Sequence, residues 1–203
     1  MSDQHAPMPT AEGLAEPLRS RWSPSVFDDD FELGDEQVVT LLRAGQWAPS
    51  WGNTQPWRFF VARRADRTHQ VLVEHLSRGN SGWVPRASVV LLTATQVAPD
   101  PDGEGGGPHA AYDLGQAAAH ITIQAASMGL HAHQFAGFDR AAVAARLGVP
   151  GHYAVLSGIA VGRRGRPDEV DERVRGKEDR VRRRRSLAEF VYADAWGSPW
   201  RPE

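Results

Sequence analysis

The longest stretch without Asp, Glu, Lys or Arg, residues 114–138, constrains the fold most, because a segment with no charges is expected to be largely buried. Gln116, His120 and Gln124 recur within it every four residues, so they lie on one stripe of a helix whose other faces are apolar. These polar groups argue against a membrane span, although the length would allow one. We therefore predict a helix over 109–129 in the core or at a subunit interface, with its polar stripe either hydrogen-bonded there or contacting a ligand.

The composition excludes several kinds of protein. A chain of 203 residues, 41% of them hydrophobic, is long enough for one folded domain with a sizeable core. Its 23 basic and 25 acidic side chains give a net charge of −2, so there is no overall attraction to nucleic acid or to an anionic membrane. The absence of cysteine excludes disulfides, zinc–thiolate sites, iron–sulfur clusters and thiolate nucleophiles. It also fits a reducing, cytoplasmic compartment, and the first residues lack the basic and apolar parts of a signal peptide.

Helical and strand patterns are mixed along the chain without a regular period, which favours an α+β fold. Residues 1–17, rich in Pro, Ala and acidic side chains, are expected to form a disordered tail before a single domain over 18–203. A loop with four glycines covers 99–108, and the strand over 87–95 is apolar enough to be covered on both faces. The predicted helices are 35–47, 66–76, 109–129 and 139–147, and the predicted strands are 57–62, 87–95 and 153–161.

Three segments carry groups suited to chemistry. Residues 21–27 supply a cation and hydroxyl groups, residues 48–57 form a polar turn, and four arginines at 182–185 precede a short C-terminal helix. The last belong to a basic segment, 163–185, with eleven basic and six acidic residues. Arg21 and the arginine run could bind a phosphate jointly. The alternatives are a solvated or nucleic-acid-binding run, and a turn whose polar groups bond to one another.

Taken together, these segments resemble the nitroreductase family. The resemblance lies in RxSxxxF at 21–27, APSxxNxQPW at 48–57, the helix YDLGQAAAHITIQAASMGLHA, the GFD turn and a basic run before LxEFV, and it covers about residues 18–195. It implies an α+β fold with a central, mostly antiparallel sheet flanked by helices. It also implies an intertwined homodimer with two FMN sites at the subunit interface.

The resemblance further implies a set of FMN contacts from several parts of the chain. The phosphate and ribityl contacts would come from Arg21, Trp22, Ser23, Arg182 and Arg184. The ring would be contacted by a loop of the partner subunit containing Pro49, Ser50 and Asn53, by the Asn80 side chain at the pyrimidine edge, and by the backbone N–H groups of Ala136 and Gly137 at N5 and O4.

Two positions depart from the family pattern. Ser25 stands where many members have a Lys or Arg near the flavin N1 and O2, and Trp83 stands where many have a Lys. A cation there stabilises the anionic reduced ring and helps to hold the nicotinamide cofactor, so its absence bears on both the reduction potential and the use of NAD(P)H. Trp51 and Trp83 would either frame an aromatic pocket or pack in the core. Known nitroreductases often carry a helical insertion over the substrate where this chain has only the short loop 99–108. The active site is therefore expected to be more open.

The eight histidines are not placed at metal-binding spacing, and no metal site is predicted. His131 and His133 lie two residues apart, which suits one face of a strand, and we interpret them as structural.

The implied activity is ping-pong transfer of electrons from NADH or NADPH through FMN to a small-molecule acceptor such as a nitroaromatic or a quinone. The chemistry then takes place on the flavin, and no side chain is required as acid or base. Two alternatives within the fold are an FMN-dependent oxidase or dehydrogenase of a biosynthetic intermediate, and a flavin-binding protein that stores FMN without turnover. A third alternative, from a different class, is a protein that binds nucleic acid through the arginine run.

Overall fold

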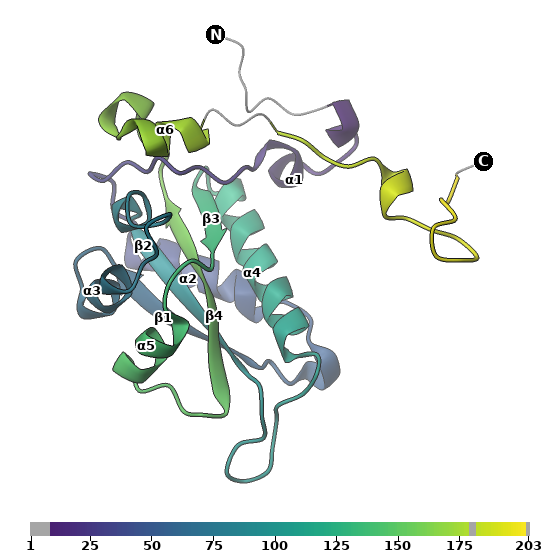
Figure 1. The fold of residues 1–203 in the computed structure, drawn as a ribbon, viewed down its shortest axis with the longest axis horizontal. Coiled ribbons are helices and arrows are strands. Elements are labelled where there is room, and N and C mark those ends of the chain that lie inside the picture. The colour runs from purple at the N-terminus through teal and green to yellow at the C-terminus, as the bar shows by residue number, and fades with distance from the viewer. Residues whose placement is uncertain (1–8, 179–181, 202–203) are drawn as a thin grey trace.

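The computed structural model describes residues 9–178 and 182–201, and it is built around one antiparallel sheet (Figure 1). The strand order is β1-β2-β4-β3. All neighbouring strands run antiparallel, which confirms the predicted α+β class with its antiparallel sheet. The strands are β1 (Trp57–Arg63), β2 (Val89–Gln96), β3 (His131–Phe135) and β4 (Tyr153–Gly162).

Helices cover both faces of this sheet. Helices α2 and α4 pack on one face, and α3 and α5 pack on the other, while α1 and α6 lie across the end where β3 begins (Figure 1). The bounds are α1 (Glu16–Ser20), α2 (Asp35–Gln46), α3 (Arg67–Glu74), α4 (Ala110–Ser127), α5 (Arg140–Arg146) and α6 (Glu172–Glu178).

Strand β2 lies between two neighbours and is buried along its whole length, as its apolar run predicts. Val89 and Leu91 pack with α2 and α4, whereas Val90 and Leu92 pack in the cluster on the α3 and α5 side. Successive side chains of a strand point to opposite faces, so a two-sided core requires a strand that is apolar at every position.

The predicted helix starts follow from capping. The Asp66 carboxylate accepts a hydrogen bond from the His69 N–H of α3 at 2.7 Å, and the Asp139 carboxylate accepts one from the Ala142 N–H of α5 at 3.0 Å. Each bond satisfies a backbone donor that has no partner within its helix.

Helix α4 is half-buried rather than enclosed by its own chain. Leu114, Ala117, Ile121 and other small or apolar residues face the sheet and α2. The opposite face stays uncovered, and its exposed residues are Ala111, Tyr112, Gly115 and Ala119. Among the described helices, none is long and apolar enough to cross a membrane.

Three features differ from expectation. A 3-10 turn (Pro9–Ala11) and α1 occupy part of the segment assigned to a disordered tail, while residues 1–8 lie outside the described residues. The expected C-terminal helix is wrong: in the described residues 186–201, the arginine run is followed only by a 3-10 turn, Leu187–Glu189. Helix α6 is absent from the predicted elements, and strand β3 is anticipated only by the spacing of His131 and His133. Each of these elements is short, and its pattern is dominated by polar side chains.

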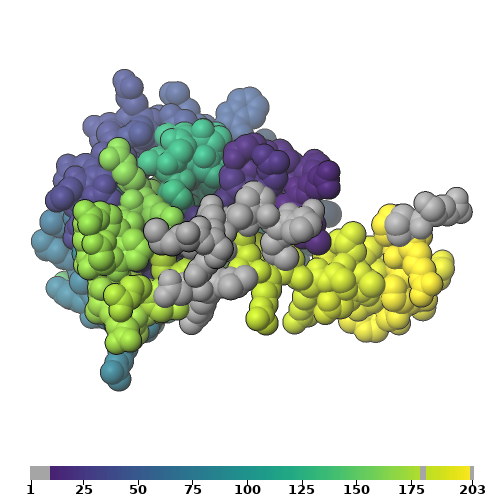
Figure 2. All heavy atoms as spheres, turned by 90° about the horizontal axis from the view of Figure 1, so that it is seen from above, coloured from purple at the N-terminus to yellow at the C-terminus, as the bar shows by residue number. Residues whose placement is uncertain are grey.

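The C-terminal arm, residues 186–201, projects away from the body of the molecule (Figure 2). Its large apolar side chains are uncovered, with Trp196 93% and Phe190 56% exposed. Leu187 and Phe190 share a groove with Leu14 and Leu18 of the N-terminal segment, but both remain more than half exposed. Large exposed apolar groups of this kind mark sites of association between proteins.

Candidate functional site

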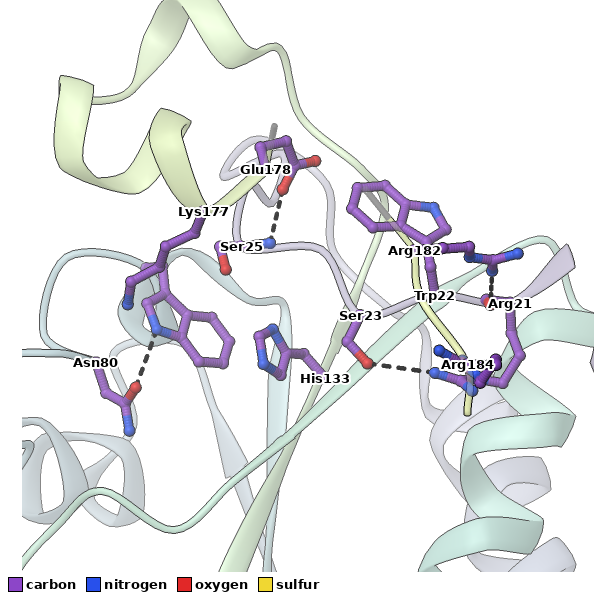
Figure 3. Close-up of a pocket in the computed structure, with 11 residues that line it drawn as sticks. Arg21, Trp22, Ser23, Ser25, Asn80, His133, Lys177, Glu178, Arg182 and Arg184 are labelled. Carbon is purple, nitrogen blue, oxygen red and sulfur yellow. Dashed lines mark hydrogen bonds between the residues drawn. The ribbon is translucent and has the colours of Figure 1, made fainter. Parts of the chain in front are cut away.

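A cavity of about 380 Å³ lies at the end of the sheet, beneath α6 (Figure 3). Segments far apart in the sequence form its walls: the extended residues 21–25, the turn 78–83, strand β3, the end of α6 and residues 182–184. Many of its lining residues are those implied for FMN: Arg21, Trp22, Ser23, Ser25, Asn80, Trp83, Arg182 and Arg184. The structure adds His133, Lys177 and Glu178.

Two guanidinium groups meet at one side of this cavity. Burial, and then the charge of nearby Arg184, lower the pKa of Arg21, so the two cations repel one another. The Arg21 Nη2 donates to the Ser23 hydroxyl at 3.4 Å, while its buried Nε has no hydrogen-bond partner among the described residues. Within residues 9–178 and 182–201, no carboxylate forms an ion pair with Arg21 or Arg184. A phosphate would relieve the repulsion and supply the missing acceptor.

Arg182 holds the N-terminal segment in position. Its guanidinium donates to the carbonyls of Arg19 at 3.0 Å, of Ser20 at 2.9 Å and of Arg21. These carbonyls end α1, where a cation is favourable because the last carbonyls lack partners within the helix. Arg182 therefore places the backbone of Arg21. Its implied contact with a phosphate stays a prediction.

Asn80 is oriented on the other side of the cavity by bonds at both ends of its amide. Its Oδ1 accepts from the Trp83 indole at 3.1 Å, and its Nδ2 donates to the Gly137 carbonyl at 3.1 Å. A Cβ at Gly137 would lie 2.6 Å from that Nδ2, so this approach requires glycine. Two of the predicted positions, Asn80 and Gly137, are thus in direct contact. Ala136 lies exposed just after β3.

His133 lies in the cavity, a role that the structural interpretation from sequence missed. Its ring stacks on Trp83 with centroids 4.2 Å apart, and its Nδ1 lies 2.7 Å from the Pro24 carbonyl. Because a carbonyl only accepts, Nδ1 carries the proton and Nε2 is an acceptor. Burial lowers the pKa of His133 most, and the Lys177 ammonium lowers it further, against the effect of the Pro24 bond. The ring is therefore neutral at pH 7.

Helix α6 closes the cavity and was also missed. The carboxylate of Glu178 accepts from the Ser25 N–H at 2.9 Å and from the Arg164 Nε at 3.3 Å. Burial raises the pKa of Glu178, although these two donors act in the opposite direction. Lys177 donates to the Gly79 carbonyl. Only Val174 anchors α6 in the core, which is too weak an apolar signal to predict a helix from sequence.

The polar turn lies elsewhere in the single chain. It contains Pro49, Ser50 and Asn53 and lies near the start of α4, whereas the cavity lies near the end of that helix (Figure 1). Its polar groups bond locally: the Gln55 N–H donates to the Ser50 hydroxyl at 3.0 Å, and the Gln55 amide donates to Asn53 at 3.2 Å. Trp51 is 68% exposed there, so within one chain it frames no pocket with the buried Trp83.

The neutral state of His133 predicts a pH-dependent stability. Its pKa is lowered on folding, so the unfolded chain binds the proton more readily and stability falls as the pH drops below about 6.5. His133→Asn keeps a donor for the Pro24 carbonyl and cannot titrate. We expect its urea midpoint to change less than that of the wild type between about pH 7.5 and about pH 5.5. Burial also lowers the pKa of His69, but this contribution is the same in both proteins. An equal change in both would therefore contradict this assignment.

Comparisons with known proteins identify the family of the chain. The model of the nitroreductase family matches residues 18–163. An uncharacterised 15.4 kDa protein encoded in the ask 5′ region of Mycolicibacterium smegmatis is 36% identical over 150 residues, covering 70% of this chain and 99% of that protein. A putative NADH dehydrogenase/NAD(P)H nitroreductase of Archaeoglobus fulgidus is 27% identical over 151 residues, covering 71% and 82%.

The fold has a similar counterpart among solved structures. An oxidoreductase crystallised with FMN superposes with a TM-score of 0.85 and 28% sequence identity, covering 98% of this chain and 100% of the other. The family model spans most of the chain and includes much of the cavity, from Arg21 to His133. The chain belongs to the nitroreductase family.

Proposed function

We propose that this protein is an FMN-dependent oxidoreductase that transfers electrons from NADH or NADPH to a small electron-poor acceptor, such as a nitroaromatic or a quinone, in a ping-pong cycle. The observation that carries the proposal is the convergence of Arg21 and Arg184 in one cavity, with no carboxylate among the described residues paired to either. Family membership and the FMN-containing counterpart support the flavin. The name of the Archaeoglobus relative supports a nicotinamide reductant.

The residues of the cavity fit the parts of FMN. Arg21, Ser23 and Arg184 would bind the phosphate, with Trp22 beside the ribityl chain. Asn80, already oriented by Trp83 and Gly137, would bind the pyrimidine edge. The neutral His133 offers an acceptor at Nε2 for a hydroxyl or ring N–H.

The flavin supplies the redox chemistry when bound, taking up hydride and passing electrons on. The chain contributes binding and orientation. The backbone N–H groups of Ala136 and Gly137 would donate to N5 and O4, which leaves the side chain at 136 loosely constrained. The missing cysteine favours a reducing compartment, and a cytoplasmic location is part of this proposal.

We further propose that the active unit is a homodimer. The uncovered face of α4 carries Ala111, Gly115 and Ala119, which would allow close approach of a second helix. The C-terminal arm presents apolar side chains that its own body does not cover. The turn with Pro49, Ser50 and Asn53 is remote from the cavity of its own chain, so a dimer is needed for it to contact a flavin.

The phosphate assignment is tested by Arg21→Ala combined with Arg184→Ala. Loss of two charge-assisted contacts, worth about 1.5–3 kcal/mol each, should weaken FMN binding by about 100-fold or more, and the protein should purify colourless. The control is Arg183→Ala with Arg140→Ala, which removes the same charge from residues outside the cavity. Full flavin content in the first variant would overturn the assignment.

The reaction class is tested by anaerobic mixing of the holoprotein with NADH or NADPH. We expect the visible flavin absorbance to bleach and to return when a nitroaromatic or a quinone is added. No bleaching with either nucleotide would support flavin storage. Rapid reoxidation by oxygen, with no NAD(P)H turnover, would support an oxidase or dehydrogenase. Salt-sensitive retention on DNA that disappears when residues 182–185 are replaced would support the nucleic-acid alternative.

The dimer is tested by Gly115→Glu. In an isolated chain this change should be neutral or stabilising, because nothing lies within 4 Å of the added Cβ and Glu favours a helix more than Gly does. At a dimer interface it buries a carboxylate, so we expect a monomer by sedimentation and a loss of bound FMN. Ala145→Glu, on an exposed face of α5, serves as the control and should remain dimeric. A dimeric, flavin-loaded Gly115→Glu protein would refute this interface.

A further inference from the structure

The two sides of the cavity differ in the charged side chains that line them. The side with Arg21 and Arg184 is positive and suits a phosphate. The other side holds Asn80 and Trp83. Lys177 extends from α6 toward Asn80 (Figure 3). The next step rests on the proposed function, in which this second side would receive the pyrimidine part of the flavin ring.

Ser25 and Trp83 supply no charge to this side. The Ser25 N–H bonds to Glu178, and the Trp83 indole bonds to Asn80. Both residues are buried, at 3% and 1% exposure, and these bonds hold them in place. A cation at this side has to come from another element.

Lys177 brings that cation from α6. Its ammonium donates to the Gly79 carbonyl, which directly precedes Asn80 in the chain. Its charge reaches into the cavity, since it lowers the pKa of His133. Helix α6 is held in place on both sides, by Arg173 donating to the Arg78 carbonyl at 2.6 Å and by Glu178 accepting from Ser25 at 2.9 Å.

We propose that Lys177 is a positioned cation that stabilises the reduced flavin ring, replacing the charges that Ser25 and Trp83 lack. The oxidised ring is neutral, whereas the reduced ring carries a negative charge near N1 and O2. An ammonium in a partly buried cavity therefore favours the reduced form over the oxidised form. Lys177 thereby raises the reduction potential of the bound FMN.

The test compares the FMN-loaded wild type with Lys177→Met, Lys177→Arg and Arg175→Met. Arg175 lies on the same helix, is exposed and does not line the cavity, so its replacement removes the same charge at a matched place. The midpoint potential is measured by equilibration with a reference dye, and the Kd of oxidised FMN by fluorescence. Apoprotein thermal midpoints show that each variant is folded, and Lys177→Gln substitutes for Lys177→Met if the latter is not.

We expect Lys177→Met to lower the ratio of reduced to oxidised FMN affinity by about tenfold, which is a potential about 30 mV more negative for a two-electron couple. Lys177→Arg should keep most of the wild-type potential, and Arg175→Met should shift it by less than a third as much. A Lys177→Met potential equal to that of the wild type, or an equal shift in Arg175→Met, would overturn the inference and leave the proposed function standing. A wild-type protein that binds no FMN would overturn the proposed function itself.

Discussion

The site depends on the bonds between Arg182 and the carbonyls at the end of α1. These bonds join the two ends of the folded chain, because Arg182 follows α6 while Arg19, Ser20 and Arg21 lie near the N-terminus. They bring Arg21 close enough to Arg184 for the two charges to perturb one another. Repulsion between like charges in a half-buried place costs free energy, and an anionic ligand offsets that cost. In the proposed site, a bound phosphate would therefore make this arrangement more favourable.

The opposite side of the cavity is built from neutral groups that orient one another. Trp83 donates to Asn80, Asn80 donates to the Gly137 carbonyl, and the His133 ring stacks on Trp83. Burial keeps His133 uncharged, so its Nε2 remains an acceptor. Helix α6 adds Lys177 and Glu178 to this neutral frame, with Glu178 compensated by Ser25 and Arg164. Charge on this side thus comes from α6, a short helix that has almost no apolar signal of its own.

The proposed dimer would be linked to the site through α4. The face that packs on the sheet carries Leu114, Ala117 and Ile121, while Ala111, Gly115 and Ala119 remain open on the other side. A helix that is apolar nearly all round is expected to be covered on all sides, and the described part of the chain leaves this face of α4 exposed. The remote position of Ser50 and Asn53 leads to the same proposal, because their turn reaches a flavin only from a neighbouring copy.

The sequence alone determined the sheet class, the buried central strand β2, the caps Asp66 and Asp139 and most of the cavity lining, because periodicity, capping and family motifs are local signals. Only the tertiary structure decided that Arg182 binds carbonyls, that Gly137 approaches Asn80 too closely for a side chain, and that His133 and Lys177 face the cavity. Each of these facts depends on contacts between segments that lie about 40 or more residues apart along the chain, and no local pattern encodes such a distance. The arginine run shows the difference most clearly: its charge is visible in the sequence, but which arginine holds the chain and which faces the ligand depends on where α1 ends.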